Sequence, residues 1–148
     1  MCASHLARRF LNRFESLSMH IAEFVAAEAL KPFRWGETDC SSTVDRWISL
    51  KTGQSPLAQA GLVYRNEYDA TALLIERGSF PVVVNRAMRL IGFEKTETPQ
   101  TGDVGLILHN RKMCLAIHAE TFWFSRDENG LIGASLDAIW KAWRIQCQ

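Results

Sequence analysis

The sequence lacks the features that define several large classes of protein. Its four cysteines, Cys2, Cys40, Cys114 and Cys147, include no CxxC pair, which argues against a zinc ribbon and against a dense disulfide framework. No window reaches the ~18 apolar residues that a membrane-spanning helix needs, and charged residues interrupt the N-terminal region where a signal peptide would be unbroken. We therefore expect reduced thiols, with a Cys2–Cys147 disulfide as the minor alternative, and no membrane insertion.

Net charge is also nearly missing. The 17 lysines and arginines almost cancel the 16 aspartates and glutamates, and no basic stripe with interleaved aromatic residues occurs. The chain therefore has no electrostatic signature of a nucleic-acid-binding protein, and we expect a neutral or mixed-charge polymer as partner instead. Its 148 residues, 47% of them hydrophobic, are enough for one domain with a core of its own. We expect that domain to span residues 1–148, with residues 1–30 as an N-terminal helical extension.

Helical periodicity dominates the first two thirds of the sequence. The predicted helices lie at residues 4–30 (one long helix or two shorter ones), 39–51, 67–77 and 81–90. For the second of these, Thr38 or Asp39 is the predicted N-cap, and Gly53 is the predicted stop.

Short apolar runs separated by turn residues begin after residue 103. They predict strands at 104–109, 113–119 and 121–125, with a short fourth strand at 131–134 and a final helical turn within 136–143. Helices followed by a small antiparallel sheet indicate an α+β fold.

Cys40 stands where a turn-forming stretch ends and the second predicted helix begins. Unpaired backbone N–H groups and the positive end of the helix dipole favour the thiolate, which is the nucleophilic form of cysteine. Cysteine is also among the most buried residue types, so Cys40 could equally fill the core beside Val44, Trp47 and Ile48. The residues alone leave both interpretations open.

Three short motifs occur in order along the chain: Phe33-Arg34-Trp35-Gly36, Asp39-Cys40-Ser41 and Gly102-Asp103-Val104. They resemble the signature of the NlpC-type cell-wall cysteine peptidases, which have a papain-like fold. The chain is also similar to small proteins of tailed phages and prophages, through Tyr64 and the C-terminal Ala142-Trp143-Arg144-Ile145 as well. This resemblance implies a cysteine-bearing helix packed on a small antiparallel sheet.

The resemblance also implies a function. It predicts a peptidase at a phage tail tip that cuts peptide bonds of peptidoglycan, with no cofactor and no metal. Cys40 would attack the amide carbonyl, His118 would take the thiol proton and return it to the leaving amine, and Trp35, Asp39 and Ser41 would bind substrate. Its partners would be other phage tail proteins and the peptidoglycan peptide. The protein would be made in the host cytoplasm and carried in the virion tail.

The sequence departs from the family pattern at the expected base. When the run from Cys114 to Ile117 is laid on the family's His-Val-Gly-Ile, the histidine position falls on Cys114. His118 comes four residues later, about 13 Å further along a strand at roughly 3.3 Å per residue. Either a register shift makes His118 the base, with His109 as the weaker candidate, or the base is absent. A second departure is Phe33, where the family usually has a tyrosine.

Three alternatives to the peptidase are open. The first follows from these departures and is a catalytically degenerate structural or assembly protein of the tail tip with the same fold. The second is a cytoplasmic cysteine hydrolase or transferase that acts on a small amide. The third, a zinc site made by Cys40, Cys114 and His118, lacks a fourth ligand.

Overall fold

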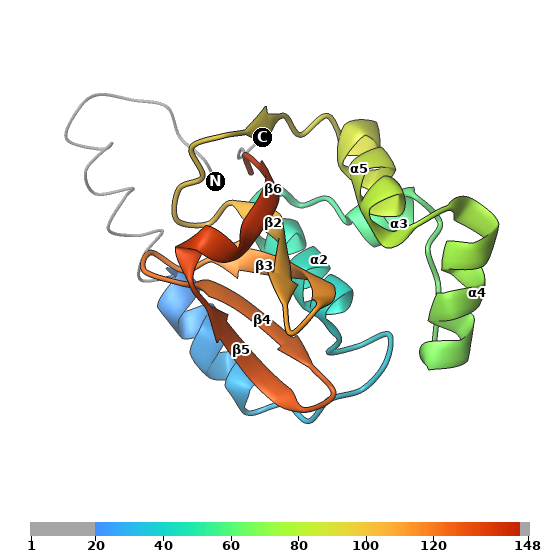
Figure 1. The fold of residues 1–148 in the computed structure, drawn as a ribbon, viewed down its shortest axis with the longest axis horizontal. Coiled ribbons are helices and arrows are strands. Elements are labelled where there is room, and N and C mark those ends of the chain that lie inside the picture. The colour runs from blue at the N-terminus through green and yellow to red at the C-terminus, as the bar shows by residue number, and fades with distance from the viewer. Residues whose placement is uncertain (1–19, 146–148) are drawn as a thin grey trace.

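The computed structural model describes residues 20–145, which form an α+β fold (Figure 1). A helical segment at residues 20–29 precedes four labelled helices: α2 (Cys40–Thr52), α3 (Pro56–Gln59), α4 (Glu67–Arg77) and α5 (Phe80–Ile91). The strands are β1 (Lys95–Thr96), β2 (Val104–His109), β3 (Lys112–His118), β4 (Trp123–Asp127), β5 (Gly130–Ala134) and β6 (Ile139–Trp143), with a 3₁₀ turn, η1 (Leu136–Ala138), before β6. The predicted α+β class is therefore confirmed. Of the helix predicted at 4–30, residues 4–19 lie outside the described residues.

Helix α2 begins and ends at residues that the sequence identifies. The Asp39 carboxylate accepts a hydrogen bond from the Ser42 N–H at 3.0 Å, which satisfies one of the unpaired donors of the first turn. At the other end Gly53 adopts a left-handed conformation with φ of 76°, and its N–H donates to the Ser49 carbonyl at 2.8 Å. These two caps fix Cys40 as the first helical residue.

The strands form one six-stranded antiparallel sheet in the order β1-β6-β2-β3-β4-β5. Strands β2 and β3 make a hairpin whose turn residues Asn110 and Arg111 have φ of 48° and 64°, as a two-residue hairpin turn requires. The strand predicted at 121–125 begins only at Trp123, because Thr121 still donates to the Ala119 carbonyl in a turn.

The prediction of a final helical turn within 136–143 was wrong in its larger part. Only η1 is helical there, and Ile139–Trp143 is the strand β6, which pairs with both β1 and β2. Pairing on two sides satisfies the backbone groups that a helix would have satisfied internally. β6 approaches β2 so closely that a Cβ added at Gly105 would clash with the Lys141 carbonyl oxygen, 2.8 Å away.

Helix α2 packs against one face of the sheet. Its buried residues Val44, Trp47 and Ile48 share one apolar cluster with sheet residues that include Leu115 and Ile117. The residues of β3 that alternate with these, Cys114 and Ala116, belong to a second cluster. That cluster also contains residues of β2, β4, β5 and β6: Ile107, Trp123, Ile132, Ala134 and Ala142. Because successive strand residues point to opposite faces, the two clusters lie on the two sides of the sheet. Cys40 is partly buried and packs against both.

The helical segment 20–29 is held to the body by one buried carboxylate. Glu28 is 1% exposed and lies 2.7 Å from Arg46 of α2 and 3.7 Å from Arg126 of β4. Burial raises the pKa of Glu28, but the hydrogen bonds and positive charges of Arg46 and Lys31 outweigh this effect and lower it. In the same segment the ring of Phe24 packs edge-on against Trp47 with centroids 5.2 Å apart.

Helix α4 is the least attached of the labelled helices. It contains no buried residue, and Figure 1 shows it at the edge of the molecule beside α5. Tyr68 and Ile75 of this helix are more than four-fifths exposed. In the part of the chain described here, no helix has the length and apolar character needed to cross a membrane.

Candidate functional site

Cys40 lies beside a network built on the Asp39 carboxylate. Asp39 is 4% exposed and accepts hydrogen bonds from the Gly36 N–H at 2.6 Å and from the Tyr64 hydroxyl at 2.6 Å. It also accepts both the N–H and the hydroxyl of Ser42 at 3.0 Å. One carboxylate therefore joins the preceding loop, the start of α2 and the segment before α4. Because its oxygens are occupied by these donors, Asp39 positions the residues around the thiol rather than offering a free acid to a substrate.

Tyr64 completes this network from a distance of 25 positions in the sequence. Burial and the negative charge of Asp39 raise the pKa of the Tyr64 hydroxyl, so the group remains a neutral hydrogen-bond donor. Gly36 lies directly against the Tyr64 carbonyl, where an added Cβ would overlap it, and has φ of 80°. The glycine of the Trp35-Gly36 motif is thus required by this close approach.

Cys114 lies near the Cys40 thiol. Cys40 packs against the apolar cluster that contains Cys114, and both cysteines are free. The influence of the Cys114 side chain and burial raise the pKa of Cys40 well above its ordinary value, while the Cys40 side chain lowers the pKa of Cys114. The Leu115 N–H also faces the Cys40 sulfur, and the Ser41 hydroxyl lies 3.9 Å from it.

His118 lies at the other end of strand β3. Its backbone N–H donates to the Asp103 carbonyl at 2.8 Å, and its ring packs edge-on against Trp123 with centroids 5.1 Å apart. Burial lowers the pKa of His118, although the Asp103 charge opposes this, and the buried Nδ1 has no hydrogen-bond partner. Since Cys114 is the residue beside Cys40, His118 is displaced from the thiol by about 13 Å along the strand, at roughly 3.3 Å per residue.

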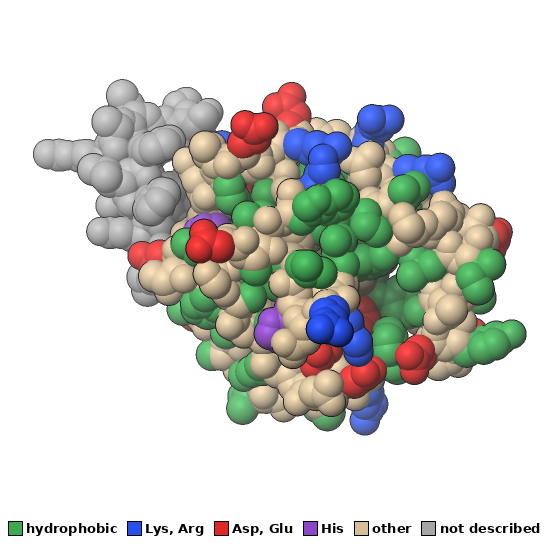
Figure 2. Space-filling model, viewed as in Figure 1, with side chains coloured by type: hydrophobic (Ala, Val, Ile, Leu, Met, Phe, Trp, Pro, Cys, Tyr) green, Lys and Arg blue, Asp and Glu red, His purple; other side chains and the backbone are tan. Residues whose placement is uncertain are grey.

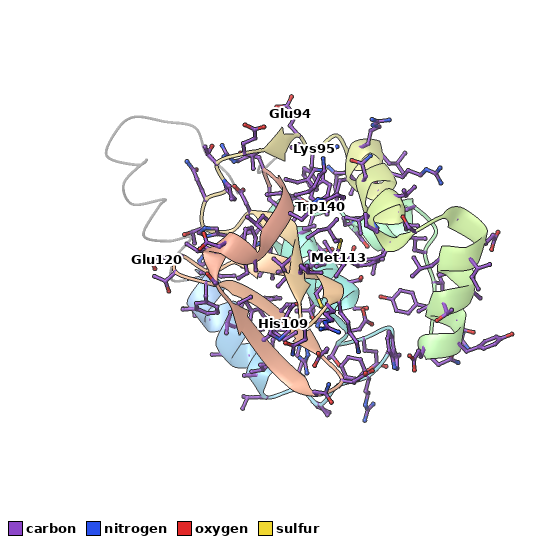
Figure 3. All side chains as sticks on the ribbon, viewed as in Figure 1. Glu94, Lys95, His109, Met113, Glu120 and Trp140 are labelled. Carbon is purple, nitrogen blue, oxygen red and sulfur yellow. The ribbon has the colours of Figure 1, made fainter. Side chains whose placement is uncertain are left out.

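None of the described histidines is hydrogen-bonded to Cys40. His20 interacts with Lys51 at 2.7 Å, and His109, labelled in Figure 3, lies at the end of β2 opposite Lys112. The structure therefore brings together Cys40, Asp39 and Ser41 from the predicted site but does not join His118 to them. Within residues 20–145 there is also no cluster of three or more residues able to hold a metal ion.

A cleft of about 510 Å³ opens beside Cys40 and Cys114. Figure 2 shows the hollow, with hydrophobic side chains around it, between α4 and the rest of the molecule. Phe33 and Trp35, whose rings pack edge-on at 5.4 Å, line it near α2, and Met113, labelled in Figure 3, lines it from β3. The walls from α2, α3, α4 and α5 are largely apolar, and charged residues line the cleft on the side of β3 and β4: Lys112, Arg126, Asp127 and Glu128. The volume lies within the range of small-molecule or peptide sites.

Two residues of this site were not assigned a role from the sequence. Cys114 was considered in the sequence only at the histidine position of the motif and as a possible zinc ligand, and the structure places it in a buried core cluster against which Cys40 packs. Tyr64 was noted only as part of a resemblance, and no local pattern indicates its bond to Asp39.

One family model matches the chain from residue 12 to residue 145, and its description is Domain of unknown function (DUF6950). The chain belongs to this family. No curated protein matches the chain. The description of the DUF6950 family names no activity, so function has to be argued from the thiol pair, the Asp39 network and the cleft.

Proposed function

We propose that this DUF6950 protein is a catalytically inactive relative of the NlpC-type peptidases that serves as a structural or assembly protein of a phage tail tip. The observation that carries the proposal is that no histidine among the described residues is hydrogen-bonded to Cys40, which packs instead against the cluster that contains Cys114. The tail-tip setting is taken from the sequence resemblance described above.

The missing base is the first argument. A cysteine peptidase needs a general base within about 2.6 to 3.2 Å of the thiol, or somewhat further without substrate. The Cys114 side chain instead raises the pKa of Cys40, which keeps Cys40 as the thiol. A protonated thiol is a poor nucleophile, so this arrangement opposes attack on an amide.

The second argument concerns stabilisation of an oxyanion. Phe33 has no hydroxyl to offer, and its ring packs on Trp35. The nearby hydroxyl of Tyr64 is already donated to Asp39. A lost oxyanion donor typically costs about 3 kcal/mol of transition-state stabilisation.

The cleft supports a binding role in place of hydrolysis. Its apolar lining and its volume of about 510 Å³ suit an extended apolar segment of a partner protein, which would bury side chains there without being cut.

The proposal is tested by genetic complementation together with a biochemical assay. In the phage or prophage that encodes this protein, deletion of the gene should abolish infectious particles, and the Cys40→Ala variant should restore them as well as the wild type does. Purified wild-type protein should release no more new amino termini from peptidoglycan than Cys40→Ala releases. Cleavage by the wild type but not by Cys40→Ala would overturn the proposal, as would normal infectivity and tail assembly without the gene.

An active peptidase remains the second candidate, because one feature favours it. Cys40 is the first residue of α2, and its sulfur faces the Leu115 N–H at the wall of an open cleft, which is the position of a nucleophile. This candidate requires a rearrangement that brings His118 to the thiol. The same pair of assays distinguishes it, since it predicts cleavage and no complementation by Cys40→Ala.

A further inference from the structure

Strand β5 (Gly130–Ala134) forms an open edge of the sheet. It comes last in the strand order and pairs with β4, and none of the described residues pairs with its outer side. Figure 1 shows it at the margin of the sheet. An edge strand presents backbone N–H and C=O groups to which a strand of another chain can bond.

The pairing of β4 shows which backbone groups of β5 point outward. The Phe122 carbonyl accepts a hydrogen bond from the Ala119 N–H at 2.8 Å, so alternate residues from Phe122 onward direct their backbone groups toward β3. Ser125 lies between two of these residues and therefore bonds to β5, where Ile132 is its partner. The backbone groups of Ile132 are thus used within the sheet, and those of the residues on either side of it point to the open edge.

Leu131 and Gly133, the residues on either side of Ile132, are accessible from solvent. Both are exposed, Leu131 to 49%, whereas Ile132 is 5% exposed and belongs to the second apolar cluster. The stretch 130–136 contains no charged residue and no proline. Charged residues and prolines are common means by which an edge strand avoids pairing with another chain, and β5 lacks both.

The opposite edge of the sheet is protected by contrast. Strand β1 is two residues long, Lys95 and Thr96, and the acidic Glu94 and Glu97 flank it. Short edge strands and charged side chains, lysine above all, prevent pairing with another chain. The difference between the two edges indicates that β5 is the edge suited to association.

We propose that two copies of this chain pair through their β5 edges, antiparallel and with the two-fold axis at Ile132, so that their six-stranded sheets join into one. The partner is a second copy because β5 is complementary to itself in this register. The inference goes beyond the proposed function, since no residue of β5 lines the cleft.

The register explains this self-complementarity. Leu131 of one copy lies opposite Gly133 of the other, and each of the two symmetric pairs joins outward-pointing backbone groups and exchanges two hydrogen bonds. Gly133 leaves room for the leucine side chain. On the same side of the strand the Phe122 ring lies 3.6 Å from where a Gly133 Cβ would stand, so the leucine gains an apolar neighbour across the interface.

Sedimentation velocity of the full chain over a concentration series, under reducing conditions, measures the association. The unsubstituted chain should pass from monomer to dimer and no further, because two-fold pairing uses up the β5 edge. Leu131→Lys should raise the dimer Kd at least about tenfold, since it places two added charges in the interface. Leu108→Lys is the matched control, because Leu108 is a 57% exposed leucine of β2, away from β5, and it should leave the Kd unchanged.

Three results of this experiment would overturn the proposal. They are a chain that stays monomeric throughout the series, a chain that grows into assemblies larger than the dimer, and equal Kd values for Leu131→Lys and Leu108→Lys. Far-UV circular dichroism checks that both variants are folded.

A crosslinking experiment tests the register. At the two-fold axis the two copies of Ile132 form a non-hydrogen-bonded pair with Cα atoms about 4.5 Å apart, within the range of about 4.4 to 6.8 Å that a disulfide bridges. In a chain with Cys2→Ser and Cys147→Ser, Ile132→Cys should therefore give a crosslinked dimer on mild oxidation, mapped by mass spectrometry. Leu131→Cys should not, because its two copies are offset by two residues, about 7 Å, along the strands. Crosslinking of Leu131→Cys as readily as Ile132→Cys, or of neither, would contradict the proposed pairing.

Discussion

The two ends of strand β3 carry different reactive side chains, a thiol at one end and an imidazole at the other. At one end Cys114 belongs to the apolar cluster against which Cys40 of α2 packs. At the other end His118 packs on Trp123 with an unpaired ring nitrogen. A nucleophile position and an imidazole therefore exist in one domain, yet the imidazole is about four residues, or roughly 13 Å, away from where it could act. The comparison shows that a cysteine and a histidine in one domain do not form a catalytic dyad when the histidine lies too far along the strand from the thiol.

Asp39 holds together the residues around Cys40, so substitution of Asp39 should have the largest effect on the free energy of unfolding. Asp39→Ala leaves the Tyr64 hydroxyl and the N–H groups of Gly36 and Ser42 without their acceptor. We expect a loss of about 3 kcal/mol in the free energy of unfolding, measured by urea denaturation. Asp39→Asn, which keeps one acceptor oxygen, should lose clearly less; equal losses for the two variants would contradict the assignment of the carboxylate as the organising group.

The next effect tests the long-range part of the same network. Tyr64→Phe removes one hydroxyl donor to Asp39 and should lower the free energy of unfolding by roughly 1.5 kcal/mol. Tyr68→Phe is the matched control, because Tyr68 is 82% exposed and should give no measurable change in urea denaturation. A loss of the same size in Tyr68→Phe would mean that removing any tyrosine hydroxyl lowers the free energy of unfolding by this amount, whether or not it binds Asp39.

The bounds of helix α2, which packs against β3, could be predicted from the sequence, because the residues that cap a helix are local signals. Asp39 and Gly53 bound α2 as expected, since caps act within a few residues. Strand β6 was not predicted, because its identity depends on pairing with β1 and β2, which lie far away in the sequence.

The site itself was only partly predictable for the same reason. Cys114 follows from aligning a motif, whereas the Tyr64–Asp39 bond depends on how the loop before α4 folds back onto α2. The orientation of His118 is set by tertiary contacts with Trp123 and the Asp103 backbone, which no local pattern reveals.

Placing a basic side chain at the Cys114 end of β3 tests the difference between the two ends of the strand. In Cys114→His an imidazole replaces the sulfur beside Cys40, so the pKa of Cys40 should fall from its raised value. At pH 7 the rate of Cys40 alkylation by iodoacetamide should increase at least about tenfold, one pKa unit being a tenfold change in thiolate. Cys114→Asn fills a similar volume without a basic nitrogen and should give no such increase; an equal increase with Asn would show that loss of the thiol partner alone accounts for the effect.

The histidine end should give the smallest effect. His118→Leu removes a buried ring with an unpaired nitrogen, and we expect the free energy of unfolding at pH 8 to change by less than about 1 kcal/mol.

The stability of the wild type relative to His118→Leu should also depend on pH. Burial lowers the pKa of His118, so the unfolded chain binds a proton that the folded chain does not in the window below the ordinary value of about 6.5. The wild type should therefore gain stability relative to His118→Leu as pH rises through that window. A relative gain as pH falls would mean that His118 is paired with an anion when folded.

The most direct test of the account is the pH dependence of Cys40 alkylation, followed by mass spectrometry of the Cys40 peptide, in the wild type and in His118→Leu. Because the Cys114 side chain and burial raise the pKa of the Cys40 thiol, the rate should rise only on the alkaline side of the ordinary thiol pKa, and the two proteins should give superimposable profiles. The account would be contradicted if the alkylation rate of the wild type already rose below pH 7 and if the His118→Leu substitution shifted that rise to another pH.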